Sequence, residues 1–77
     1  MVTLDKIPFS DIKIGMRCRS LPTNTKGTLT KFRENYRENS NDQEGFFTIE
    51  WDNGSVSVNT IFCDGPWAGQ NIEVLNG

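Results

Sequence analysis

The chain of 77 residues contains no histidine and only two cysteines, Cys18 and Cys63. The absence of histidine removes the side chain that most often acts as a general acid or base near neutral pH. It also removes the usual nitrogen ligands of zinc, and two cysteines cannot complete a tetrahedral shell. Cys63 has no neighbouring base that would activate its thiol. We therefore expect no catalytic residues, no metal site and no cofactor.

Long hydrophobic runs are also missing. No apolar stretch approaches the ~20 residues that a membrane-crossing helix needs. Residues 1–6 lack the basic and then apolar regions of a secretory signal. These absences favour a cytoplasmic protein with reduced cysteines and argue against contact with a membrane. A hydrophobic content of 35% with 23% charged residues is typical of a small globule, so we treat residues 1–77 as a single domain.

The net charge of −2 conceals an uneven distribution along the chain. All eight lysines and arginines lie in the first 37 residues with three acids, and the other seven acids follow, so the two parts carry +5 and −7. In a small barrel, basic and acidic strands can alternate and neutralise each other. Alternatively, the asymmetry creates a surface dipole that steers a charged partner. The sequence leaves both interpretations open.

Asn53-Gly54 predicts the best-defined feature of the fold, a β-hairpin with a two-residue type I′ turn. This turn sets Trp51 opposite Val56 and Ile49 opposite Val58. One face of the ribbon is then apolar and the other polar, as a half-buried antiparallel pair requires.

Alternation of apolar and polar residues predicts five short strands, at 16–20, 28–33, 46–52, 55–62 and 71–75. Residues 1–14 lead into the first strand, and the polar residues 33–45 are expected to form a long loop. Leu29 and Phe32 cannot both face inward in a regular strand, so we expect a bulge or a strong bend there. Curling of the sheet into a barrel is expected to bury one set of side chains together: Ile49, Trp51, Val56, Val58, Leu29, Met16, Ile72 and Val74.

Three segments together resemble the core pattern of the SH3-like small β-barrels, which include Tudor, KOW and Mind-bomb-type domains. The segments are Gly15-Met16-Arg17-Cys18, Gly27-Thr28-Leu29 and Thr48-Ile49-Glu50-Trp51-Asp52-Asn53-Gly54. The resemblance spans roughly residues 14–75 and implies an all-β fold. That fold is a five-stranded, SH3-like, partly open barrel with one long polar loop. Mind-bomb-type domains match the Trp-Asp-Asn-Gly segment best, but lack the long loop and the element at 63–67. A shared fold does not carry a function with it, so no functional residues are transferred.

We predict a binding function with another protein as partner, in an adaptor, a regulator or an inhibitor. Trp67 follows Gly-Pro in a loop, where it either anchors a partner or closes one end of the barrel. Phe46 and Ile61 fall on the polar face of the hairpin and suggest a contact patch or homodimer seam, unless a bulge turns Ile61 inward. Tyr36 in the polar loop is a lesser candidate. The protein is then a monomer or a weak homodimer.

A nucleic-acid-binding module is the alternative, using a basic strand face of Arg17, Arg19, Lys31 and Arg33. If the first two strands pair, these four cations share one surface, as contact with phosphates requires. The isoelectric point near 4.9 and the interspersed acids count against this interpretation. A third possibility is an aromatic cage for a modified cation at one end of the barrel. It would draw on Trp67, Phe62, Phe46 and Tyr36.

Overall fold

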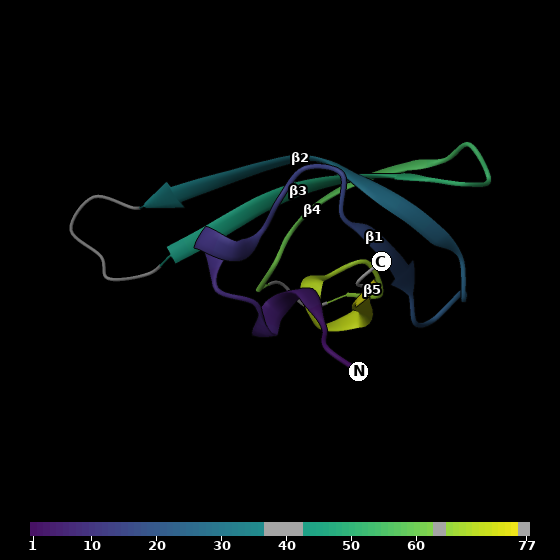
Figure 1. The fold of residues 1–77 in the computed structure, drawn as a ribbon, viewed down its shortest axis with the longest axis horizontal. Coiled ribbons are helices and arrows are strands. Elements are labelled where there is room, and N and C mark those ends of the chain that lie inside the picture. Colours follow the sequence, from purple (N-terminus) through teal and green to yellow (C-terminus); the bar gives the residue numbers. More distant parts are fainter. Residues whose placement is uncertain (37–42, 63–64, 76–77) are drawn as a thin grey trace.

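The computed structural model describes residues 1–36, 43–62 and 65–75; the side chains of 35, 36, 43 and 44 lie outside that description. One antiparallel sheet contains five strands: β1 (Arg17–Ser20), β2 (Lys26–Tyr36), β3 (Gln43–Trp51), β4 (Val56–Thr60) and β5 (Ile72–Leu75) (Figure 1). Short 3₁₀ turns are η1 (Leu4–Lys6), η2 (Phe9–Asp11) and η3 (Gly69–Asn71). The strand order is β4-β3-β2-β1-β5, and the sheet is not closed. The predicted all-β class with five antiparallel strands is confirmed.

The two central strands are longer than the sequence predicted. β2 continues to Tyr36 and β3 begins at Gln43, and these two residues are paired. The predicted loop at 33–45 was therefore wrong at both ends. Polar residues are compatible with a strand where its faces are solvated, because the backbone ladder does not depend on apolar alternation. Residues 37–42, between the two strands, lie outside the described part of the chain.

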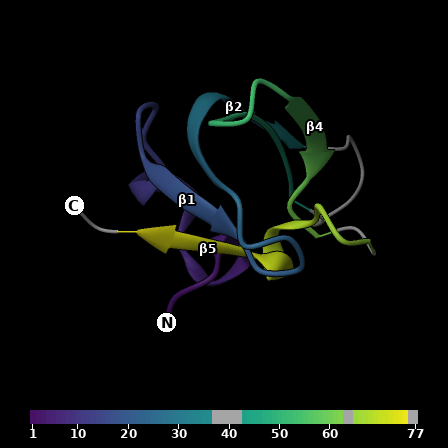
Figure 2. The same cartoon turned by 90° about the vertical axis from the view of Figure 1, so that its right-hand side faces the viewer.

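β2 bends at a bulge and connects β1 and β5 on one side of the sheet with β3 and β4 on the other. Leu29 pairs with Ile49 and Lys31 pairs with Thr48, which leaves Thr30 as the extra residue. The predicted bulge is confirmed, since Leu29 is buried and Phe32 packs against the core. β2 pairs with β1 before the bulge and with β3 along its length. Figure 2 shows β1 and β5 on one side, β4 on the other, and β2 curving between them.

The β3–β4 hairpin turns through three residues, 52–54, and the predicted two-residue turn was wrong. The amide of Trp51 donates to the carbonyl of Ser55 at 2.8 Å, and the amide of Gly54 donates to the carbonyl of Trp51 at 2.9 Å. Gly54 has a φ of +92°, whereas Asn53 is not among the described residues with positive φ. This combination is a type I turn closed by a glycine bulge. The Asn53 side chain supports it by accepting a hydrogen bond from the Ser55 amide at 2.9 Å.

The extra loop residue shifts the register by one and turns β4 over. Ile49 pairs with Ser57, so the serine faces the core and the valines on either side of it face outward. Val56 and Val58 are 57% and 69% exposed, and their predicted place in the core was wrong. A single-residue shift has this effect because successive side chains of a strand point to opposite faces.

Ile61 follows the same register and lies in the core at 1% exposure. Its amide donates to the carbonyl of Gly45 at 2.9 Å, which continues the β3–β4 ladder past the end of β4. The predicted apolar patch of Phe46 and Ile61 on one face was therefore wrong. The alternative prediction, that Ile61 turns inward, agrees with its burial. The cause is the register of the β3–β4 hairpin and not a bulge.

The core fills the concave face of the sheet. Trp51 is only 4% exposed, as predicted, and its indole N–H donates to Ser57 Oγ at 2.9 Å. The buried apolar side chains are Leu4, Ile12, Cys18, Leu29, Phe47, Ile49, Trp51, Ile61, Ala68, Ile72 and Val74. In the described part of the chain, no helix is long and apolar enough to span a membrane.

The N-terminal segment does more than lead into the sheet. Leu4 and Ile12 are buried and belong to the core. The amide of Val74 donates to the carbonyl of Val2 at 2.8 Å, and Thr3 forms an isolated bridge with Glu73. The segment therefore covers part of the outer edge of β5.

Gly27 lies close to the ring of Trp51 and provides a test of this core. A Cβ at position 27 would lie 2.7 Å from Cε3 of Trp51 and 2.9 Å from the carbonyl oxygen of Glu50. We expect Gly27→Ala to lower the free energy of unfolding by about 1–3 kcal/mol through overpacking, measured by urea denaturation.

Gly45→Ala is the matched control for that experiment. The three atoms nearest to a Cβ at position 45 are all ends of side chains, the closest at 2.9 Å, and these can move more readily than a backbone carbonyl. Its loss of stability should be smaller. Equal losses for the two variants would contradict the close packing of Gly27 on Trp51.

Candidate binding surfaces

The described side chains include no group of three or more His, Cys, Asp or Glu residues that could hold a metal ion. Cys18 is buried at 3% exposure, and its Sγ lies 3.7 Å from the carbonyl oxygen of Gly27. Burial raises the pKa of the Cys18 thiol to about 11. The thiol therefore stays protonated near neutral pH and is a poor nucleophile. Cys63 lies outside the described residues.

Arg17 and Arg19 are both engaged by acids. Arg17 binds the two carboxylate oxygens of Asp52 through separate nitrogens, at 2.7 and 3.0 Å. This hydrogen bonding lowers the pKa of Asp52 and raises the pKa of Arg17. Arg19 donates through Nε to Glu73 at 2.9 Å and through Nη1 to Asn24 at 2.7 Å. These two cations are therefore neutralised by acids from later in the chain.

Lys31 and Arg33 have a different setting, beyond the bulge of β2. Both are exposed, and neither forms an ion pair with a described residue. The basic surface predicted from four cations is thus divided into two paired arginines and two cations open to solvent. Tyr36, another predicted contact residue, ends β2, but its side chain lies outside the described part of the structure.

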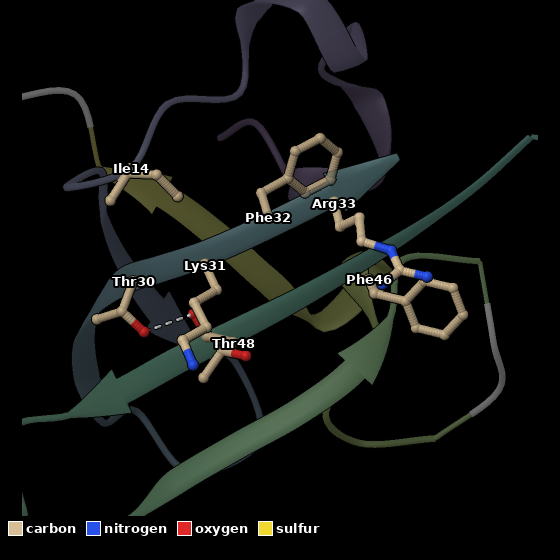
Figure 3. Close-up of a pocket in the computed structure, with 7 residues that line it drawn as sticks. All are labelled: Ile14, Thr30, Lys31, Phe32, Arg33, Phe46 and Thr48. Atoms are coloured by element: carbon tan, nitrogen blue, oxygen red, sulfur yellow. Dashed lines mark hydrogen bonds between the residues drawn. The ribbon is translucent and has the colours of Figure 1, made fainter. Parts of the chain in front are cut away.

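A hollow of about 460 Å³ lies over β2 and β3 beside the bulge (Figure 3). Thr30 and Lys31 both line it, and the Thr30 hydroxyl donates to the carbonyl of Thr48 at 3.3 Å. Arg33 is the cross-strand partner of Phe46, and Figure 3 shows the guanidinium group reaching toward that ring. The complete lining is Ile14, Thr30, Lys31, Phe32, Arg33, Phe46 and Thr48. We refer to it as the outer hollow.

A second concave surface runs along β4, the outermost strand on its side of the sheet. Trp67 is half-buried, and its ring centroid lies 5.4 Å from that of Trp51. A groove of about 330 Å³ lies between this indole pair and the strand. Its lining consists of Trp51, Ser55, Val56, Ser57, Val58, Asn59 and Trp67. We refer to it as the β4 groove.

At two residues of β4, the backbone groups along this edge bond to no other described residue. Ser55 and Ile61 are both hydrogen-bonded to β3, so odd-numbered residues point their backbone groups toward β3. Val56 and Val58 then direct N–H and C=O toward the open edge, where no described residue bonds to them. β4 reads Val-Ser-Val-Asn-Thr and lacks the charges and prolines that commonly protect an edge strand.

The predicted contact residues are thus separated by the structure. Phe46 lies in the outer hollow, Trp67 in the β4 groove and Ile61 in the core. Sequence reasoning missed Val56 and Val58 as surface residues, because it assigned them to the core through the wrong turn. The glycine at the end of Asp-Asn-Gly was the available signal, since a three-residue loop also places glycine last.

The comparisons with known proteins identify no relative: no protein-family model, no curated protein and no solved structure matches this chain.

Trp67 both covers the ring of Trp51 and lines the β4 groove, so its truncation should have an intermediate effect. We expect Trp67→Ala to lower the free energy of unfolding by about 1–2 kcal/mol, less than the ~3–5 kcal/mol of a fully buried aromatic. Trp51→Ala is the buried reference. Chemical denaturation measures both, and equal losses would show that Trp67 is wholly part of the core.

The Cys18 thiol should make stability depend on alkaline pH. Its pKa is raised from 9.0 to about 11 in the folded state, so the folded chain holds this proton more tightly than the unfolded chain. The resulting stabilisation is complete below pH 9.0 and is lost as the pH rises toward 11. Melting temperatures across this range should fall more steeply for the native chain than for Cys18→Ala. Parallel pH profiles would contradict the burial of this thiol.

Proposed function

We propose that this chain is a small non-catalytic binding module that holds an extended segment of another protein at the edge of β4. The observation that carries the proposal is the uncharged edge at Val56 and Val58 beside Trp67, where the outward backbone groups bond to no described residue. Such a module would act as an adaptor, regulator or inhibitor, and we propose the cytoplasm as its setting. We also propose an SH3-like, partly open barrel, supported by five short strands and by the bend in β2.

The edge geometry supports strand addition. An extended segment lying antiparallel or parallel to β4 would exchange backbone hydrogen bonds with Val56 and Val58. The side chains of the added segment would point alternately to the outer, solvent-exposed face of the sheet and to its inner face, where Ser57 lies. A side chain on the inner face would enter the β4 groove, beside Ser57 and the Trp67 ring. A large apolar side chain suits that position, because hot-spot residues fill well-packed pockets.

A second copy of the chain suits the groove less well. If Val56 and Val58 of two copies pair with each other, Ser57 lies opposite its own counterpart on the twofold axis. A serine side chain would leave most of a groove of about 330 Å³ unfilled. The chemistry of the groove therefore favours a different sequence as the added strand.

The nucleic-acid alternative has weaker support. Arg17 and Arg19 are paired with acids, which leaves Lys31 and Arg33 as the open cations of the predicted set. Two phosphate contacts provide little counterion release. The isoelectric point near 4.9 also disfavours approach to a polyanion.

Selection from a phage library of random peptides tests the proposal, followed by calorimetry with a selected peptide. Val58→Pro is the decisive variant, because proline removes an N–H that bonds to no described residue and obstructs the open edge. We expect peptide affinity to fall by about tenfold or more, the scale of one or two lost backbone hydrogen bonds.

Val58→Thr is the matched control, since it keeps both the N–H and the branched shape, and its affinity should be nearly native. Denaturation curves establish that both variants fold. Native affinity in Val58→Pro would refute strand addition at β4. If light scattering shows a dimer that Val58→Pro disrupts, the strand added at β4 is a second copy of the chain and not a peptide from another protein. Tight, salt-sensitive binding of oligonucleotides would favour the nucleic-acid alternative.

A further inference from the structure

We propose that the outer hollow is a separate binding site for a small organic anion, an aromatic or branched apolar group that carries a carboxylate or a phosphate. This inference does not depend on strand addition at β4. It rests on the apolar walls of the outer hollow, on the open cations at its rim and on the bulge that directs one of these cations outward.

The walls contain apolar side chains that the core does not use. Ile14 is 60% exposed, and Phe46 faces outward while its neighbour Phe47 is buried. Together with Phe32, which also packs against the core, these side chains line an open hollow of about 460 Å³. Pockets for small ligands commonly enclose about 300–1,000 Å³. A single ring or a short branched chain therefore fits against Phe46.

The rim carries positive charge only. Lys31 and Arg33 line the hollow, none of its seven lining residues is acidic, and neither cation is ion-paired to a described residue. A guanidinium presents paired N–H donors that match a carboxylate or phosphate. The hydroxyl groups of Thr30 and Thr48 lie on the same lining. The charge of the site thus selects an anion over a neutral or cationic ligand.

The bulge explains why a cation lies here at all. In a regular strand that buries Leu29, the residue two positions later would also point inward. Thr30 is the extra residue of the bulge, so Lys31 lies opposite Thr48 and faces outward. Bulges commonly redirect side chains in this way next to functional sites.

Titration of the full-length, ¹⁵N-labelled protein with phenyl phosphate tests the proposal, with chemical shifts as the readout. We expect saturable shifts confined to residues 12–16, 30–34 and 45–49, with a dissociation constant of about 1–10 mM, as the size of the ligand allows. Phenylacetate should bind at the same amides. Inorganic phosphate and benzylamine should each bind about tenfold more weakly, because one lacks the ring and the other the anion.

Arg33→Gln removes one cation from the rim while preserving most of the side chain. We expect it to weaken phenyl phosphate binding by about tenfold. Arg19→Gln is the matched control: Arg19 is paired with Glu73 and is not part of the lining, so affinity should stay within about twofold of native. The amide spectrum of each variant also reports whether it is folded.

Several results would overturn the proposal. These are shifts that fail to saturate, shifts scattered over the whole sheet, and unchanged affinity in Arg33→Gln. Oligothymidylate is the probe for a surface that binds a phosphate backbone instead. Such a surface is indicated if oligothymidylate binds far more tightly than phenyl phosphate and if Arg19→Gln and Arg33→Gln weaken its binding equally.

A Val58→Pro variant with native affinity for phenyl phosphate would show that this site is separate from the β4 edge.

Discussion

The length of the β3–β4 loop is the constraint on which both surfaces of β4 depend. One hydrogen bond, from the Trp51 amide to the Ser55 carbonyl, closes the loop around three residues. Because the loop has three residues and not two, each side chain of β4 points to the opposite face of the sheet from the one that a two-residue loop would give it. Ser57 is thereby placed under the Trp51 indole and accepts its hydrogen bond, while the valines on either side are left outside. The buried indole and the apolar edge are consequences of the same closure.

Much of the fold could be predicted from the sequence, because its strongest signals are local. The alternation around Cys18 predicted the inward and outward residues of β1, and the spacing of Leu29 and Phe32 predicted the bulge. Burial of Ile72 and Val74 also followed from alternation. These features need only the period of a strand and the size of its side chains.

The remaining features depend on nonlocal contacts or on a difference of one residue. Asn-Gly is compatible with loops of two and of three residues, and the apolar valines favoured the wrong choice. The ion pairs of Arg17 and Arg19 join residues far apart in the chain, so alternation could not reveal which cations stay open. Burial of Leu4 likewise depends on how the N-terminus folds back. The candidate site was less predictable than the fold for this reason.

The bridge between Thr3 and Glu73 makes the two margins of the sheet unequal. Part of one margin is paired with the N-terminal segment, whereas on the other margin the outward backbone groups of Val56 and Val58 bond to no described residue. A molecule with two bare margins could be tiled indefinitely, each unit templating the next into a fibril. With part of one margin paired in this way, fewer backbone groups of β5 are open to an added strand. Among the described residues, the folded-back N-terminus thus leaves β4 as the more open of the two outer strands.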